Sequence, residues 1–348
     1  MPSNNYSRGG FVHLGLDVSK DSIAVGILRP DEVVADVEMI ANQESSIRRL
    51  ISRFEDRKLL RTCYEAGPTG YELHRLLSSI GVANDVIAPS LMPRIPGDHV
   101  KTDRRDANRL ARLHRAGELT PIRVPSKAEE GVRDLCRARG VAVEERRRSR
   151  QRLGSFLLRH NQIFRETMHW TQAHQSWIAG LSFDDKATQS ALSFYRSVLV
   201  SCDAILASTT AELAQYYDST LFGDPVHRLS AYRGIDSLGA LTIICEVCDF
   251  RRFSHPGAFM GFCGLVPSEY SSGASVRRGH ITHAGNVYVR TQLIESAWAY
   301  QHGPSSGITI KRRQQGLGQE TISRAWKAQI RLCRRFRPKV RPKITVIP

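Results

Sequence analysis

The chain has 348 residues, of which 50 are Lys or Arg and 34 are Asp or Glu, so its formal net charge is +16. This length predicts about two domains, and the strong positive charge predicts a polyanionic partner. No apolar run approaches the roughly 20 residues that a membrane helix needs, and the polar N-terminus lacks the apolar stretch of a signal peptide. The seven cysteines are scattered without a disulfide-like spacing. We therefore expect a cytoplasmic protein in a reducing compartment, with no membrane partner.

The N-terminal region alternates apolar runs with polar turns in a way that predicts an α/β domain. Three strands come first, and helices then alternate with further strands. This is the strand order of an RNase H-like (RuvC-like) domain, in which the first and fourth strands are neighbours. The expected strands are residues 11–17, 22–28, 33–40, 59–65 and 82–88, and the expected helices are 43–55 and 68–80.

Four acids stand where this fold would gather them. Asp17 and Glu65 end the first and fourth strands, so their side chains should lie side by side. Thr102 is a suitable N-cap for a helix that runs to about residue 116, and Asp103 and Asp106 share one face of that helix. If this helix packs beside the first strand, all four carboxylates converge. Clustered carboxylates repel one another and need a cation, and a divalent metal beside phosphates is typical of phosphodiester chemistry.

The rest of the chain is predicted to be mainly helical. Residues 126–160 form a long helical stretch dense in arginine, and residues 167–217 continue as helix. Residues 229–253, with Gly234 and Gly239 at a turn, resemble a helix-hairpin-helix element that contacts DNA, or form a plain helix–turn–helix in the core. Cys245 and Cys248 are expected to pack in a core helix and not to bind metal. The expected divisions are residues 1–125, 126–224, 225–310 and a basic C-terminal helix and tail at 311–348.

Five sequence blocks then identify a family. The blocks are LGLDVSK at 14–20, YEAGPTGY at 64–71, KTDRRDA at 101–107, GLVPSEYSSG at 264–273 and HITHAGNVYVR at 280–290. Together, in this order, they resemble the DEDD insertion-sequence transposases, which are also called bridge-RNA-guided serine recombinases. The resemblance extends from about residue 11 to residue 298. It implies an RNase H-like catalytic domain, a helical or coiled-coil segment and a C-terminal transposase domain.

The resemblance also implies the chemistry of the site. It implies that Asp17, Glu65, Asp103 and Asp106 bind Mg²⁺, and that Ser272, the serine directly before a glycine, is the nucleophile. Ser271 is the neighbouring alternative. Implied partners are donor and target DNA, a structured guide (bridge) RNA, and further copies of the chain, as a dimer that becomes a tetramer in the synaptic complex. Expected nucleic-acid contacts are Lys101, Arg104, Arg105, Arg146, Arg147, Arg150, Arg277, Arg278 and Arg290.

Two other classes of protein remain open at this point. The first is a metal-dependent nuclease of the Holliday-junction-resolvase type, which would use water as its nucleophile and form no covalent protein–DNA intermediate. The second is a nucleic-acid-binding protein without catalytic activity. Strong salt dependence of binding is expected for all three classes, so it does not distinguish them.

Overall fold

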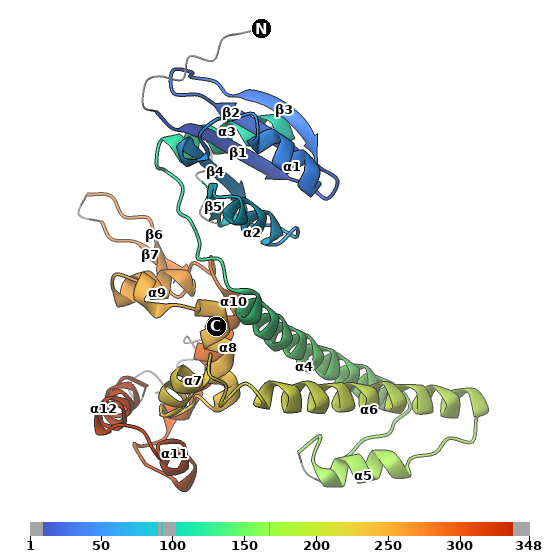
Figure 1. The fold of residues 1–348 in the computed structure, drawn as a ribbon. Helices are drawn as coiled ribbons and strands as arrows, with labels where there is room; N and C mark the ends of the chain where they lie inside the picture. Colours follow the sequence, from blue (N-terminus) through green and yellow to red (C-terminus); the bar gives the residue numbers. More distant parts are fainter. Residues whose placement is uncertain (1–9, 90–91, 93–101, 167, 274, 337–348) are drawn as a thin grey trace. The chain divides into compact units, whose positions relative to one another are not determined.

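The computed structural model describes residues 10–89, 92, 102–166, 168–273 and 275–336 of the chain (Figure 1). The chain divides into two compact units, Met1–Val124 and Pro125–Pro348, which are described separately below. The finer division into four parts that the sequence predicts stays a prediction.

The first unit is built on a mixed five-stranded sheet with the order β3-β2-β1-β4-β5 (Figure 1). Strands β1, β2 and β3 form an antiparallel meander, while β4 pairs in parallel with both β1 and β5. The elements are β1 (Val12–Val18), β2 (Ser22–Leu28), β3 (Asp36–Ala41), α1 (Glu44–Ile51), the 3₁₀ helix η1 (Arg57–Leu59), β4 (Leu60–Glu65), α2 (Glu72–Ser79), β5 (Ala83–Ile87) and α3 (Asp103–Arg115).

The two faces of this sheet are covered by different helices. Alternate residues of a strand point to opposite faces, so Leu14 and Leu16 of β1 lie on one side and Gly15 and Asp17 on the other. The Leu14 side packs against apolar residues of α1 and α2, including Leu50 and Leu77. Helix α3 packs on the opposite side against β1 and β2. The mixed α/β sheet agrees with the RNase H-like architecture that the sequence predicts.

Two predicted elements of this unit begin three or four residues later than expected. Strand β3 starts at Asp36 and not at residue 33, because the N–H of Ala35 donates to Asn108 Oδ1 on α3. Helix α2 starts at Glu72 and not at residue 68, since the preceding residues form a turn whose Gly70 N–H bonds the Gly67 carbonyl. In both places a local hydrogen bond shapes the backbone before the regular element begins.

The second unit is mainly helical and contains one two-stranded sheet, β6-β7 (Figure 1). Its elements are α4 (Lys127–Arg159), α5 (Gln172–Gly180), α6 (Lys186–Ala214), α7 (Gly223–Ser230), α8 (Ser237–Val247), η3 (Phe250–Arg252), α9 (Pro256–Phe262), β6 (Pro267–Glu269), β7 (Arg278–Ile281), α10 (Val287–Ala297), η4 (Trp298–Gln301), α11 (Ile308–Arg313) and α12 (Gln319–Phe336).

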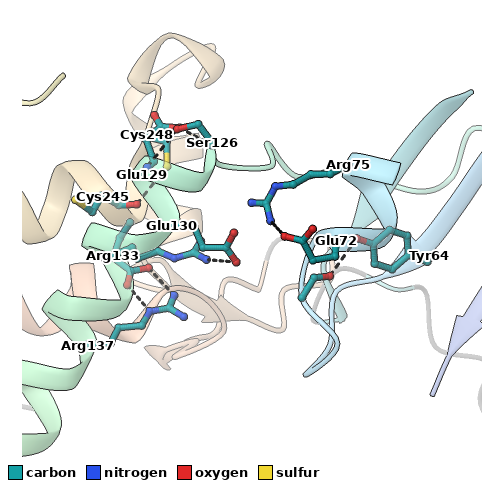
Figure 2. Close-up of polar contacts among 12 residues, drawn as sticks. Tyr64, Glu72, Arg75, Ser126, Glu129, Glu130, Arg133, Arg137, Cys245 and Cys248 are labelled. Atoms are coloured by element: carbon teal, nitrogen blue, oxygen red, sulfur yellow. Dashed lines mark hydrogen bonds and ion pairs between the residues drawn. The ribbon is translucent and has the colours of Figure 1, made fainter. Parts of the chain in front are cut away.

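Helix α4 begins at a complete capping box. Ser126 Oγ accepts the N–H of Glu129 at 3.2 Å, and the Glu129 carboxylate accepts the N–H of Ser126 at 2.8 Å (Figure 2). Two of the backbone donors that a helix N-terminus leaves unsatisfied are bonded in this way. The capping box therefore sets where the 33-residue α4 starts, one residue after the start that the sequence predicts.

Helices α4 and α6 pack against each other along much of their length. Apolar contacts near α5 include Leu153 and Leu192, and polar contacts farther along α4 include Arg139 Nε donating to Thr210 Oγ1 at 2.8 Å. The continuous helical stretch expected over 167–217 is instead two helices, because the chain turns between Leu181 and Asp185 before the side chain of Asp185 caps α6.

Helix α6 also corrects the sequence-based expectation about apolar runs. Among the residues that the structure describes, it is long and apolar enough to cross a membrane by length and composition. The core helix of a soluble protein meets the same criterion when it is mostly buried. Helix α6 buries Leu192, Leu206 and Leu213, but only 11% of its apolar window is buried in the second unit.

The turn at Gly234 faces the interior of the second unit. Gly234 has φ +85°, and a Cβ atom added there would lie 2.3 Å from the carbonyl oxygen of Ser296. Helix α8 follows, capped by Asp236, and most of its residues are buried. This packing favours the core helix–turn–helix over the DNA-contacting helix-hairpin-helix. Cys245 is buried in the same core, and Cys248 Sγ donates to its carbonyl (Figure 2).

Candidate active site

Strand pairing brings Asp17 and Glu65 together at the carboxyl ends of two adjacent strands. The parallel register of β1 and β4 pairs Leu16 with Tyr64, and the two acids are the next residues along. Neighbouring strands are about 4.8 Å apart. Asp17 lies on the same face as Gly15, and Glu65 lies on the same face as Cys63, whose thiol contacts the Leu110 carbonyl of α3 at 3.6 Å. Both carboxylates therefore point to the face that α3 covers.

Glycines allow α3 to lie directly on the strands. A Cβ added to Gly15 would be 2.3 Å from the Ala107 oxygen and 2.4 Å from the Ala111 nitrogen. One added to Gly26 would be 2.6 Å from the same Ala107 oxygen. Such distances are impossible for a real side chain, so the absence of Cβ atoms at these two positions sets the position of the helix.

The direction of α3 sends its acidic first turn toward Asp17. The two rings of His13 and His114 meet at the opposite end of the contact, with a distance of 3.3 Å between their Nδ1 atoms. The C-terminus of α3 thus lies beside the beginning of β1, and the N-terminus of α3 lies toward the end of β1. Thr102 caps that N-terminus by accepting the Arg105 N–H at 3.4 Å, as the sequence predicts.

The structure places the two acids of α3 differently. Asp106 is half-buried, one residue before Ala107 at the helix–sheet contact. Asp103 is exposed and borders a surface hollow together with Met39 and neighbouring residues of β3. Among the described part of the chain, no three His, Cys, Asp or Glu side chains lie close enough together to enclose a metal ion.

The donor set nevertheless fits Mg²⁺. Carboxylate oxygens are its preferred protein ligands, and Mg²⁺ is usually held by one or two of them together with water and substrate phosphates. Asp17 and Glu65, on adjacent strands and on one face, provide such a pair. Neither carboxylate is fully buried, so a phosphate and water could approach them.

Ser272 lies on the exposed connection between β6 and β7 in the second unit. Its backbone forms a tight bridge with Ser275, in which each N–H donates to the other's carbonyl at 3.1 Å. Gly273 follows with φ +56°, a conformation that favours glycine. The serine is therefore held at a narrow, solvent-exposed turn.

The neighbouring Ser271 has a different environment. Its hydroxyl donates to Glu269 Oε1 at 2.8 Å and accepts the Arg277 N–H at 3.2 Å. The Ser271 hydroxyl, followed by Arg278, lowers the pKa of Glu269 below its usual value. Ser271 thus ties the two sides of the hairpin together, whereas the hydrogen bonds described for Ser272 involve its backbone.

The predicted nucleic-acid contacts lie in varied surroundings. Lys101 lies outside the described residues. Arg104 and Arg105 are exposed on the first turn of α3, and Arg104 donates to the Val37 carbonyl. On the hairpin, Arg277 is exposed and Arg278 pairs with Glu269 at 3.4 Å.

Arg290 differs from the other predicted contacts. Its side chain is buried, and Nη1 donates to the carbonyls of Cys263 at 2.9 Å and His283 at 3.2 Å. This arrangement favours a structural role for Arg290, which holds the segments on both sides of the hairpin, over a phosphate contact.

Sequence reasoning missed a buried ionic group beneath this hairpin. Glu246 of α8 is 7% exposed and accepts two hydrogen bonds from Arg137 of α4, at 2.7 and 2.8 Å. It also accepts one from Asn286 Nδ2 at 2.7 Å, and the Asn286 side-chain oxygen caps α10. A charged residue within the apolar run of α8 was the available signal, since a buried carboxylate requires partners.

Comparison with known proteins identifies the family of this chain. Residues 226–307 match the transposase family IS116/IS110/IS902, and residues 14–162 match the DEDD transposase family of IS110 elements. A putative transposase, y4qE of Sinorhizobium fredii, is 41% identical over 95% of this chain and 82% of its own length. The transposase of insertion sequence IS1533 from Leptospira borgpetersenii is 30% identical over 94% of this chain and 96% of its own length.

A more distant relative matches a smaller part of the chain. The transposase of insertion sequence IS1111A from Coxiella burnetii is 24% identical over 65% of this chain and 62% of its own length. The family and relative matches define an enzyme of the DNA transposase class. The chain belongs to the IS110 family of insertion-sequence transposases.

Proposed function

We propose that this transposase cuts and rejoins DNA through a covalent bond between Ser272 and a DNA phosphate, on donor and target DNA selected by a structured guide RNA. Asp17 and Glu65 are the proposed pair that holds Mg²⁺, and Asp103 and Asp106, which are not gathered with that pair in the described part of the chain, are proposed to join it when the metal and DNA bind. The observation that carries the serine step is the exposed hairpin, where Ser272 sits at the turn while Ser271 is held by Glu269 and Arg277.

The proposed step conserves the number of phosphodiester bonds. The Ser272 Oγ–phosphorus bond forms as the bond from phosphorus to the 3′ oxygen breaks. The serine proton passes to solvent, and the departing 3′ oxygen takes up a proton. Attack by a new 3′-hydroxyl reverses these changes on a different strand, so no ATP is needed. When bound, Mg²⁺ supplies positive charge that stabilises the phosphate as it is attacked.

The protein residues have separate tasks in this proposal. The carboxylates of the first unit orient the cation and the scissile phosphate. The exposed hairpin presents the serine, and Arg277 and Arg278 beside it attract the DNA backbone. Because the acids and Ser272 belong to different units, we further propose that a homo-oligomer, a dimer that forms a tetramer on two DNAs, assembles the complete site in the cytoplasm.

Covalent trapping tests the serine step. The full chain would be expressed with the DNA that flanks its gene, so that any guide RNA is made, and then mixed with Mg²⁺ and labelled donor and target DNA. On denaturing gels we expect label on the wild-type protein and none on Ser272→Ala. The matched control is Ser271→Ala, which removes a hairpin hydrogen bond and should reduce the adduct without abolishing it.

The other outcomes have distinct meanings. An adduct on Ser272→Ala but none on Ser271→Ala would move the nucleophile to Ser271. Cleaved DNA without any adduct would replace the proposal with a water-using nuclease of the resolvase type. RNA that co-purifies with the protein, and is required for cleavage, would support the guide; cleavage by RNA-free protein would reject it.

A further inference from the structure

The second unit contains a shallow hollow between α4 and the loop before α5, away from the hairpin residues. It has a volume of about 520 Å³, within the range of about 300–1,000 Å³ that is typical of small-ligand sites. One side carries positive charge and the other carries aromatic rings. Its lining includes Arg146, Arg147, Arg150, Gly154, His169 and Trp170.

Arg150 is the central cation of this hollow. Its guanidinium carbon lies 5.0 Å from the centre of the Trp170 ring. Its Nε is buried and makes no hydrogen bond with any residue that the structure describes. Burial and the neighbouring charge of Arg146 lower the pKa of Arg150. An anion bound beside the guanidinium groups would offset the repulsion between the two arginines.

The acids near the hollow compensate this charge only in part. Arg146 is 3.7 Å from Asp203 of α6, a loose ion pair. Arg147 is held by Glu144 on its own helix at 2.8 Å. Arg150 has no ion pair with a described residue at this range, so the hollow keeps a net positive character.

Trp170 is held in an unusual backbone conformation. Its φ is +67°, and left-handed geometry at a non-glycine residue is strained and persists only where its surroundings enforce it. Here the Trp170 N–H donates to His174 Nδ1 at 2.9 Å, and the two rings meet edge to face with centres 5.1 Å apart. The contact fixes the indole at the hollow, next to the exposed His169.

We propose that this hollow binds one unpaired nucleotide of a single strand, with its base stacked on Trp170 and its phosphate bound by Arg150 and Arg146. Aromatic rings stack on any base, and arginines bind the adjoining phosphate, which is the combination that single-strand-binding proteins use. Binding of a duplex backbone would require only the arginines, and it would not use the ring of Trp170. The inference rests on the proposed function, because it assigns part of the nucleic acid to α4 of the second unit.

Gly154 lines the hollow, and the space next to it is open. A Cβ atom added to this helical glycine would meet no atom within 4 Å. Alanine there should therefore be accepted by the helix, which it favours intrinsically over glycine. Gly154→Ala should leave the protein at least as stable as the wild type while placing a methyl group where the nucleotide would lie.

A fluorescent strand tests the inference on the full chain. The probe is a pyrimidine-only single strand carrying one 2-aminopurine, made as RNA and as DNA, because 2-aminopurine fluorescence falls when the base stacks. We expect the wild type to quench the probe. Trp170→Leu should abolish the quenching and weaken binding about 5- to 150-fold, the range measured for loss of one base stack.

Matched variants separate base stacking from charge and from folding. Trp170→Phe keeps a ring and should retain most of the quenching. Arg150→Gln should weaken binding about tenfold. Arg148→Gln removes the same charge from an arginine that pairs with Glu144 and Glu145 outside the hollow, and should change binding less than threefold. The strand that is quenched more strongly identifies the source as RNA or DNA.

Two results would overturn the inference. If Trp170→Leu quenches like the wild type, the base does not stack there, and Trp170 only closes the α4–α5 turn. If Arg148→Gln and Arg150→Gln weaken binding equally, the weaker binding reflects the general positive charge of the protein and not a contact in the hollow. Either result, obtained with a protein that still forms the Ser272 adduct, rejects the hollow and leaves the proposed function standing. Loss of the adduct with quenching intact would reject the proposed function and leave the nucleotide site in the hollow standing.

Discussion

At the scale of single residues, the same chemical group takes on different roles according to its contacts. His13 and His114 meet ring to ring on the sheet, and His114 Nε2 also contacts Asp85 Oδ2 at 3.1 Å. His114 therefore has a carboxylate partner, while His13 faces cations. Burial, followed by the charges of His114, Arg115 and Arg61, lowers the pKa of His13 to about 4.

This pKa makes the stability of the first unit depend on pH. Between pH 6.5 and about 4 the unfolded chain binds a proton at His13 that the folded chain does not, so the contribution is complete above pH 6.5 and is lost as pH falls toward 4. Because His13 is only partly buried, we expect a loss of about 1–2 kcal/mol. The free energy of unfolding, measured from urea titrations at pH 7 and pH 4.5, checks this value.

A matched variant attributes the effect to His13. His13→Gln keeps a polar side chain that does not titrate in this range, so its free energy of unfolding should fall less than that of the wild type between the two pH values. An identical fall in both proteins would show that other groups cause the pH dependence.

At the scale of elements, the position of α3 depends on the absence of side chains at two glycines. Gly15 and Gly26 are paired across β1 and β2, and the Ala107 carbonyl of α3 lies above both. The helix carries Asp103 and Asp106, so its approach to the sheet also sets how near its first turn comes to Asp17. Packing and the candidate metal site are therefore linked through this one contact.

Substitution of Gly15 tests that link. In Gly15→Ala the added methyl group would overlap backbone atoms of α3, which cannot move aside as a flexible side chain could. We expect a loss of about 1–3 kcal/mol of stability, together with weaker Mg²⁺-dependent cleavage, because α3 must shift away from β1.

The control for Gly15→Ala is Gly140→Ala in the middle of α4. An added Cβ there meets no atom within 4 Å, so the substitution should stabilise the helix by about 1 kcal/mol. Opposite signs for the two variants in urea unfolding are the expected result. Equal stability of Gly15→Ala and the wild type would contradict the close approach of α3.

The elements also show how far sequence reasoning reaches. Alternating apolar residues and strand-end acids were enough to place β1 and β4 and to predict that Asp17 and Glu65 are neighbours, because strand order fixes which ends meet. The same reasoning could not find the burial of Arg290 or the Glu246–Arg137 pair. These depend on contacts between segments far apart in the chain, and no local pattern encodes them.

Side-chain details of the hairpin were likewise beyond the sequence. The residues Ser271 and Ser272 are chemically identical, and the hydrogen bonds of the Ser271 hydroxyl to Glu269 and Arg277 distinguish their environments. The α6 helix shows the opposite difficulty, since its composition alone also fits a membrane segment. Its packing on α4 gives the apolar residues that it buries a partner within the chain.

At the scale of the whole molecule, the net positive charge and the proposed metal ligands have different tasks. The net charge of +16 favours binding of nucleic acid over the whole chain, whereas the proposed metal ligands are a few acids at one sheet edge of the first unit. Binding and cleavage should therefore be separable. Asp17→Asn removes one negative charge with little change in shape, so affinity for DNA without Mg²⁺ should be unchanged or slightly higher. Mg²⁺-dependent cleavage should fall by more than the roughly 10- to 100-fold that loss of a partner of a metal ligand costs.

The control for this change is Asp31→Asn, which alters the net charge equally. Asp31 is exposed and follows β2, whose end pairs with the beginning of β1, so it lies at the opposite edge of the sheet from Asp17. Gel-shift affinity and cleavage of labelled DNA, measured on all three proteins across a Mg²⁺ titration, separate the two effects. Asp31→Asn should cleave like the wild type. Full cleavage by Asp17→Asn would remove this residue from the metal site. A loss of DNA binding measured without Mg²⁺ would show that Asp17 acts on folding, since in the absence of the cation removing a negative charge cannot weaken attraction to phosphate.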